Sequence, residues 1–119
     1  MLSTTGRPFD KDCLRSAVRG AREFQLKYGA RIYAGEFSAV AWAEGAENYL
    51  RDCISLFGEY GWDWTYHAFR EWEGWSVEHE TAGPGSPSLP SADNPRRRAL
   101  LEGLSPTTRN QTTKGQNHE

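Results

Sequence analysis

The sequence lacks most features of membrane, metal-binding and disulfide-rich proteins. It has two cysteines among 119 residues, Cys13 and Cys53, and neither belongs to a CxxC pair or a metal-ligand spacing. We interpret both as buried apolar thiols; sequence alone does not decide whether they form a disulfide. No apolar stretch approaches the roughly 20 residues that span a bilayer. The N-terminal MLSTTGRPFDKD has no apolar segment typical of a signal peptide.

An excess of basic charge is also absent. Fourteen lysine and arginine residues stand against sixteen aspartate and glutamate residues, and the formal net charge is −2. This balance gives no indication of nucleic acid or a membrane as partner. The P-loop, HExxH and GxGxxG patterns do not occur, so no nucleotide, metal or other cofactor is indicated.

Tryptophan, in contrast, is abundant and clustered. All five tryptophans lie in one short part of the chain: Trp42, Trp62, Trp64, Trp72 and Trp75. Protein cores are built mainly from leucine, isoleucine and valine, whereas tryptophan among polar residues often marks a ligand surface. The cluster therefore favours a binding site in this part of the chain.

Hydrophobic periodicity predicts alternating helices and strands. Residues 10–29 and 44–60 carry helical patterns, with Asp10 and Gly61 as end signals. Residues 31–37 and 62–69 are short, β-rich runs that fit strands. A helix between two strands implies parallel pairing, so we predict an α/β fold with two parallel strands and flanking helices.

The C-terminal part carries weaker signals. Residues 81–93 are rich in proline, glycine and serine and are predicted to form an irregular loop. Asn94 is positioned to cap a short helix that begins at Pro95. The arginines that follow are predicted to form its solvated face: Arg96, Arg97 and Arg98. Residues 105–119 are polar and aperiodic and are predicted to be a disordered tail.

Glu36 is the candidate catalytic residue. It comes at the end of the first predicted strand, after an apolar run and a glycine. In a parallel α/β barrel, side chains at the carboxyl ends of strands point into the active-site mouth. A carboxylate there can attack a sugar anomeric carbon or transfer a proton. The alternative is a solvated strand-end glutamate or one partner of a structural ion pair.

Aromatic side chains surround the end of the second predicted strand. Flat rings stack on the apolar faces of sugars, and polar groups between them bind hydroxyls. Tyr66 and His67 end this strand, and Trp72 and Trp75 lie in the loop that follows. The alternative for the rings is packing in the core or within the loop. A single histidine such as His67 is more often structural.

Two segments resemble glycoside hydrolase family 5, the cellulase family of retaining (β/α)8 barrels. IYAGEFSAVAWA (residues 32–43) and GWDWTYHAFREWEGWSVEH (residues 61–79) are similar to its last two strand-loop units, in the same order and with the same spacing. The resemblance covers about residues 9 to 104. It implies that the chain is a C-terminal fragment of a TIM barrel whose strands seven and eight are the two predicted strands.

The resemblance also implies a function and a set of site residues. Glu36 matches the nucleophile of a retaining endo-β-1,4-glucanase that cleaves β-linked polysaccharide or oligosaccharide. The family places a tryptophan at the end of strand eight, under the sugar at the cleavage point. This sequence departs there, since the register gives His67 and only the following loop supplies Trp72. The expected substrate-binding residues are Trp42, Tyr66, His67, Trp72 and Trp75.

The family's acid/base glutamate has no counterpart in the sequence. It follows an asparagine at the end of strand four, and no Asn-Glu pair occurs here. We therefore expect residues 1–104 to be part of a barrel, with the N-terminal part of that barrel as partner, and the complete protein to be secreted or periplasmic. In the isolated chain, the inner face of the two strands, with Tyr33, Trp64 and Tyr66, should then be open. The rival hypotheses are a non-catalytic sugar-binding module and an inactive truncated remnant.

Overall fold

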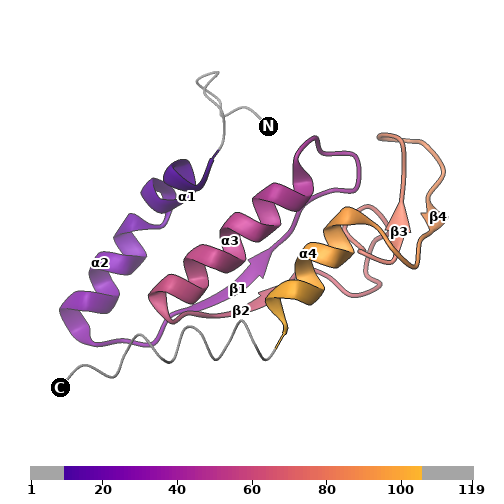
Figure 1. Ribbon diagram of the computed structural model, residues 1–119. Coiled ribbons are helices and arrows are strands. Elements are labelled where there is room, and N and C mark those ends of the chain that lie inside the picture. Colours follow the sequence, from indigo (N-terminus) through magenta and orange to yellow (C-terminus); the bar gives the residue numbers. More distant parts are fainter. Residues whose placement is uncertain (1–9, 106–119) are drawn as a thin grey trace.

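Four helices and two small sheets make up residues 10–105, the part of the chain that the computed structural model describes (Figure 1). The fold is mixed α/β, as predicted. In chain order the elements are α1 (Lys11–Ala17), α2 (Arg19–Tyr28), β1 (Tyr33–Phe37), α3 (Ala46–Tyr60), β2 (Asp63–Tyr66), β3 (His79–Glu80), β4 (Leu89–Pro90) and α4 (Pro95–Gly103). The predicted tail, residues 105–119, lies outside the described residues except for Ser105. No described helix combines the length and apolar character that crossing a membrane requires.

β1 and β2 are adjacent parallel strands, which confirms the prediction. Tyr33 pairs with Asp63 and Phe37 with Tyr66, and the register shifts between Ala34 and Phe37. β2 is shorter than the predicted strand over residues 62–69. It ends where β1 ends, because beyond the bond from the His67 amide to the Phe37 carbonyl there is no neighbouring strand backbone to pair with.

α3 lies across one face of this sheet and α4 lies beside α3 (Figure 1). The apolar stripe predicted over residues 44–60 forms the core: Leu50 and Leu56 are fully buried, and Phe57 packs edge-on against Phe37 of β1. Gly61 ends α3 in the left-handed conformation, as predicted. The buried cluster consists of Leu14, Phe37, Leu50, Cys53, Ile54, Leu56, Phe57, Trp62 and Ala99.

The opposite face of the β1–β2 sheet is open. Tyr33 is 62% exposed, and its hydroxyl hydrogen-bonds with that of Thr65, 2.7 Å away. The expectation that Trp64 and Tyr66 share this open face is wrong. Both are half-buried on the α3 side, where their rings pack edge-on against Phe37. Strand alternation explains the difference, because Trp64 and Tyr66 share the side of buried Trp62.

The single helix predicted over residues 10–29 is divided into α1 and α2. The break falls at Val18, where β-branched Val18 and then Gly20, both weak helix formers, occur. α1 contacts α3 through buried Leu14 and through two basic side chains. Arg15 binds Glu59 at 3.0 Å, and Lys11 binds the same carboxylate. Their hydrogen bonds, that of Lys11 above all, hold the pKa of Glu59 below its usual value.

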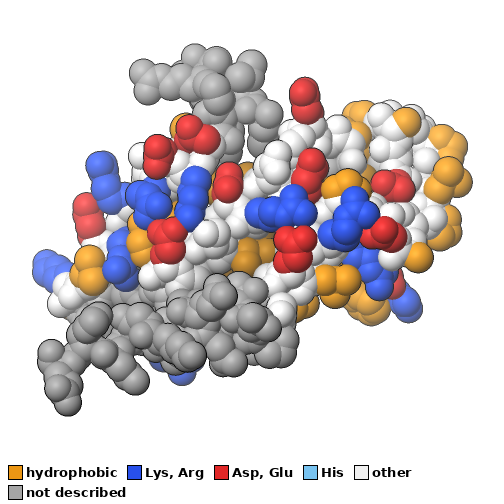
Figure 2. All heavy atoms as spheres, in the orientation of Figure 1, with side chains coloured by type: hydrophobic (Ala, Val, Ile, Leu, Met, Phe, Trp, Pro, Cys, Tyr) orange, Lys and Arg blue, Asp and Glu red, His pale blue; other side chains and the backbone are white. Residues whose placement is uncertain are grey.

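The C-terminal part differs from the prediction in two places. Residues 81–93 are not wholly irregular, since Leu89–Pro90 pairs antiparallel with His79–Glu80. The Asn94 side chain caps α4 as predicted, accepting a hydrogen bond from the Arg97 amide at 2.9 Å. The prediction that Arg96 belongs to the solvated face of this helix is wrong, because Arg96 is only 4% exposed. Elsewhere on the helical face, acidic and basic side chains are interspersed (Figure 2).

The two cysteines occupy different environments. Cys53 is buried in the core as predicted, whereas Cys13 is half-buried, and no disulfide joins them. Burial raises the pKa of the Cys53 thiol to about 11. Roughly one Cys53 side chain in a thousand is therefore a thiolate at pH 8, and only the thiolate attacks a disulfide reagent.

We expect Ellman's reagent to modify Cys13 well before Cys53 in the folded chain at pH 8. The colour change should show one fast and one slow phase, and Cys13→Ser should remove the fast phase only. Cys53→Ser provides the matched variant and should remove the slow phase. Equal rates for the two thiols would contradict the placement of Cys53 in the core.

Candidate functional site

Glu36 lies at the carboxyl end of β1, at the shift in register just before Phe37. Its side chain is 78% exposed, and its Oε1 lies 3.9 Å from Nδ1 of His67. The exposed carboxylate is therefore accessible to a ligand at this end of the sheet. No other basic group of the described residues forms an ion pair with it. An open carboxylate of this kind is suited to nucleophilic attack or to proton transfer.

His67 lies between two carboxylates at the end of β2. Its Nδ1 faces Glu36, and its Nε2 lies 3.2 Å from Oε2 of Glu71, four residues further along the chain. When protonated, the imidazole carries a charge opposite to that of both neighbours. Its ring also packs edge-on against Trp75, with the centroids 4.8 Å apart. These contacts place the ring between Glu36 and Glu71 and against Trp75.

Three tryptophan rings continue from His67 as a connected group. Trp72 packs at 88° against Trp75 with a centroid distance of 4.9 Å, and at 81° against Trp42 with a distance of 5.7 Å. Trp42 comes from the segment after β1, whereas the other two come from the loop after β2. Trp72 is 45% exposed and the other two are half-buried. We call Trp42, Trp72 and Trp75 the tryptophan cluster.

The backbone beneath the tryptophan cluster is held by side chains from other elements. Tyr66 donates its hydroxyl hydrogen to the Trp75 carbonyl, so this predicted binding residue also supports the loop. The Ala41 amide donates to the Gly74 carbonyl at 2.8 Å, which joins the segment after β1 to the loop after β2.

Arg96 of α4 makes the largest contribution to this frame. One terminal nitrogen donates to the carbonyls of Ala39 and Trp75, and the other to those of Ser76 and His79, at distances between 2.8 and 3.2 Å. No carboxylate forms an ion pair with Arg96 among the described residues. The buried cation is satisfied by four backbone oxygens from loops that are distant in sequence.

An ion pair joins two residues of the loop after β2. Arg70, a non-glycine residue with a positive φ of 53°, binds the carboxylate of Glu78 through two nitrogens, at 3.0 and 3.4 Å. The hydrogen bond from Arg70 lowers the pKa of Glu78. Glu78 is therefore ionised and paired at neutral pH, so it is not an accessible acid.

The structure brings together every predicted site residue. Glu36, His67, Trp75, Trp72 and Trp42 form one chain of neighbours, and Tyr66 supports it from below. Sequence reasoning missed the part that two residues play here, Gly74 and Arg96. Gly74 had a readable signal, as a glycine between two tryptophans.

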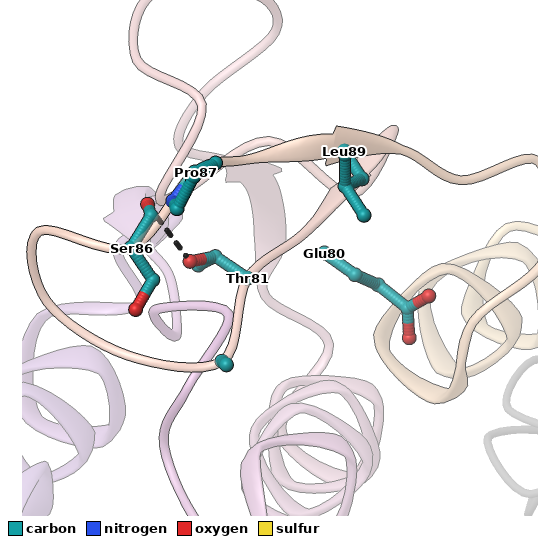
Figure 3. Close-up of a pocket in the computed structure, with 6 residues that line it drawn as sticks. Glu80, Thr81, Ser86, Pro87 and Leu89 are labelled. Carbon is teal, nitrogen blue, oxygen red and sulfur yellow. Dashed lines mark hydrogen bonds between the residues drawn. The ribbon is translucent and has the colours of Figure 1, made fainter.

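A hollow elsewhere on the surface does not belong to this site. It lies at the turn between β3 and β4 and is lined mostly by small and apolar residues (Figure 3). The lining residues are Glu80, Thr81, Ala82, Ser86, Pro87 and Leu89. The Thr81 hydroxyl donates to the Gly83 and Ser86 carbonyls, and Glu80 accepts a hydrogen bond from Ser91. The Thr81 hydroxyl and the Glu80 carboxylate are thus both engaged in hydrogen bonds.

No family model matches the chain, and a search of curated proteins finds no match. Within residues 10–105, no group of three histidine, cysteine, aspartate or glutamate side chains is arranged to hold a metal ion. What the site offers is an exposed carboxylate, a histidine beside it and a partly exposed aromatic surface. A carboxylate of this kind can act as a nucleophile or transfer a proton, and an exposed aromatic ring can stack on a flat apolar face of a ligand.

Proposed function

We propose that the chain is the C-terminal part of a retaining β-1,4-glucanase-like glycoside hydrolase barrel, in which Glu36 is the nucleophile. The observation that carries this proposal is the position of Glu36. It is an open carboxylate at the carboxyl end of a parallel strand, beside a histidine and a row of aromatic rings. Barrel enzymes place their reacting residues at this end of the strands. In the complete enzyme, Glu36 attacks the anomeric carbon and forms a glycosyl-enzyme.

The arrangement of the two strands supports the barrel part of the proposal. β1, α3 and β2 form one strand-helix-strand unit with the helix on one face of the sheet. In a barrel that helix side is the outside, and the opposite face is the interior. Here the opposite face carries Tyr33 and Thr65, which the chain itself leaves exposed. Further strands beside β1 and β2 would cover it.

The second carboxylate of a retaining enzyme must come from another part of the barrel. Retention requires two carboxyl groups about 5–5.5 Å apart on either side of the scissile bond. The nearby candidates in this chain are engaged or on the loop surface: Glu71 contacts His67, Glu78 is bound by Arg70, and Glu73 is exposed. We assign the acid/base role to a residue of the N-terminal part of the barrel.

A sugar-binding module is the second candidate function. It is favoured by one observation, the exposed Trp72 ring packed against two other tryptophans, while residues 10–105 position no second carboxylate opposite Glu36. Such a module binds oligosaccharide without cleaving it. The two functions differ in what happens when the missing barrel units are supplied.

The test is to graft residues 10–104 in place of the last two strand-helix units of a retaining β-glucanase barrel. We expect the grafted barrel to hydrolyse a chromogenic β-cellobioside with retention of configuration, measured by absorbance and by NMR of the first-formed anomer. The 119-residue chain alone should release no chromophore above buffer, because it supplies one of the two carboxylates. A grafted barrel that folds, by circular dichroism and thermal melting, but hydrolyses nothing would contradict the proposal and favour the binding module.

A further inference from the structure

His67 has a carboxylate opposite each of its two ring nitrogens. Its Nδ1 lies 3.9 Å from Oε1 of Glu36, and its Nε2 lies 3.2 Å from Oε2 of Glu71. An ionised carboxylate accepts hydrogen bonds and donates none, so the ring presents an N–H group to both neighbours only when each nitrogen carries a hydrogen. That form of the ring is the imidazolium cation. The arrangement therefore favours a positive charge on His67, between two negative charges.

The charges that face His67 come from two elements. Glu36 belongs to β1, and Glu71 belongs to the loop after β2. Trp75 of the same loop packs edge-on against the ring and has no titratable group. The cation nearest in sequence, Arg70, is bound to Glu78. The His67 side chain is 25% exposed, so solvent screens its contacts only in part.

The two carboxylates differ in what happens to them during a retaining reaction. Glu36 loses its charge when it attacks the anomeric carbon, because its oxygen then belongs to an ester. Glu71 takes no part in bond formation, so its charge stays beside the ring. Its contact with His67 is also the shorter of the two. Glu71 is therefore the partner that keeps the charged ring in place while Glu36 is an ester.

We propose that His67 and Glu71 are positioning residues for Glu36, and that their charges accelerate the second step of the reaction. This inference rests on the proposed function and adds two residues to it. In that step a water molecule attacks the anomeric carbon, the bond from that carbon to Glu36 breaks, and its electron pair returns to the Glu36 oxygen. The proton of the water passes to the acid/base carboxylate of the N-terminal part of the barrel. His67 exchanges no proton, and its positive charge stabilises the Glu36 carboxylate as it re-forms.

The same charge has the opposite effect on the first step. A cation beside the free carboxylate stabilises Glu36 before it attacks, and stabilisation of the reactant lowers the rate of attack. The charged pair therefore favours hydrolysis of the glycosyl-enzyme over its formation. A residue that only supported the fold would not change the balance between the two steps. The kinetic signature of the inference is accumulation of glycosyl-enzyme when the charges are removed.

The contact itself is tested in the full 119-residue chain. The nitrogen NMR signals of a histidine ring lie close together in the imidazolium form and far apart in the neutral form. At pH 7 and low salt, we expect the two His67 signals of the unmodified chain to lie closer together than those of Glu71→Gln, which removes one charge and keeps the shape. Glu73→Gln changes an exposed glutamate of the same loop and should leave the His67 signals unchanged.

The kinetic role is tested in the grafted barrel with dinitrophenyl β-cellobioside, whose leaving group makes the first step fast. We expect Glu71→Gln and His67→Gln each to lower kcat about tenfold and to lower KM with it, so that kcat/KM does not fall. A burst of dinitrophenol, one per enzyme molecule, should precede the steady state. Glu73→Gln should keep the kcat and KM of the parent graft. Circular dichroism and thermal melting show whether each variant is folded.

Three results would overturn the inference. They are identical His67 signals in the unmodified chain and in Glu71→Gln, parental kcat in both charge-removing variants of an active graft, and a loss of kcat/KM equal to the loss of kcat. The last result would place the effect in the first step. Any of these results beside an active parent graft refutes the charged pair and keeps the hydrolase. A folded parent graft without activity refutes the hydrolase, and the inference with it.

Discussion

Replacing Glu36 by glutamine in the grafted barrel is expected to lower turnover by about a thousandfold or more. Glutamine keeps the size of the side chain and its hydrogen-bonding capacity but removes the negative charge and the nucleophilic oxygen. Glu36 is largely exposed, and its nearest described basic group is His67 at 3.9 Å, so the change disturbs little packing. The loss should therefore appear in the rate constant kcat rather than in the melting temperature.

The matched control for this substitution is Glu23→Gln. Glu23→Gln is the same chemical change at a residue of α2. The Glu23 side chain is 71% exposed, and its ion pair with Arg19 is long, at 3.8 Å. Its turnover should equal that of the unmodified graft. Release of a chromogenic leaving group gives kcat and KM for all three proteins. Turnover of the Glu36→Gln graft within tenfold of the parent would show that Glu36 is not the nucleophile.

Replacing Arg96 by methionine is expected to lower the free energy of unfolding by about 3 to 5 kcal/mol. Methionine fills a similar volume but donates no hydrogen bond. Four carbonyl oxygens would lose their shared donor, in a part of the molecule where Arg96 itself is almost completely buried. For a domain of this size the loss is a large part of the total stability. Urea denaturation followed by tryptophan fluorescence measures it.

Arg98→Met is the matched control for Arg96→Met. Arg98 lies two residues away on the same helix, but it is exposed, and its side chain donates to the Asp93 carboxylate at 2.9 Å. Exposed ion pairs contribute less than about 1 kcal/mol, so this variant should unfold near the urea concentration of the parent. Similar losses in the two variants would mean that the Arg96 contacts do not stabilise the fold.

The parts of the fold that follow from local pattern could be predicted from the sequence. The apolar periodicity of residues 44–60 predicts α3, and the two short β-rich runs predict β1 and β2. In each case the pattern of neighbouring residues shows which side chains face the core. Helix ends at Asp10, Gly61 and Asn94 were also readable, because a cap depends only on neighbouring residues. The candidate site was readable for the same reason, since strand ends determine where Glu36 and His67 lie.

Features decided by distant contacts could not be predicted in this way. Arg96 is one of three consecutive arginines, and nothing local distinguishes it from Arg97 or Arg98. Its burial depends on four carbonyls that lie 17 to 57 residues away in the sequence.

The contacts of Arg96 have a consequence for how this molecule can vary between species. Arg96 binds backbone oxygens only, and every amino acid carries one. The side chains at positions 39, 75, 76 and 79 can therefore change through mutation without removing a single hydrogen bond to the arginine. Such an arrangement lets the side chains of these segments vary while the path of their backbone is retained. What selection has to keep is then the arginine itself, because its four bonds depend on Arg96 and not on the identity of its partners.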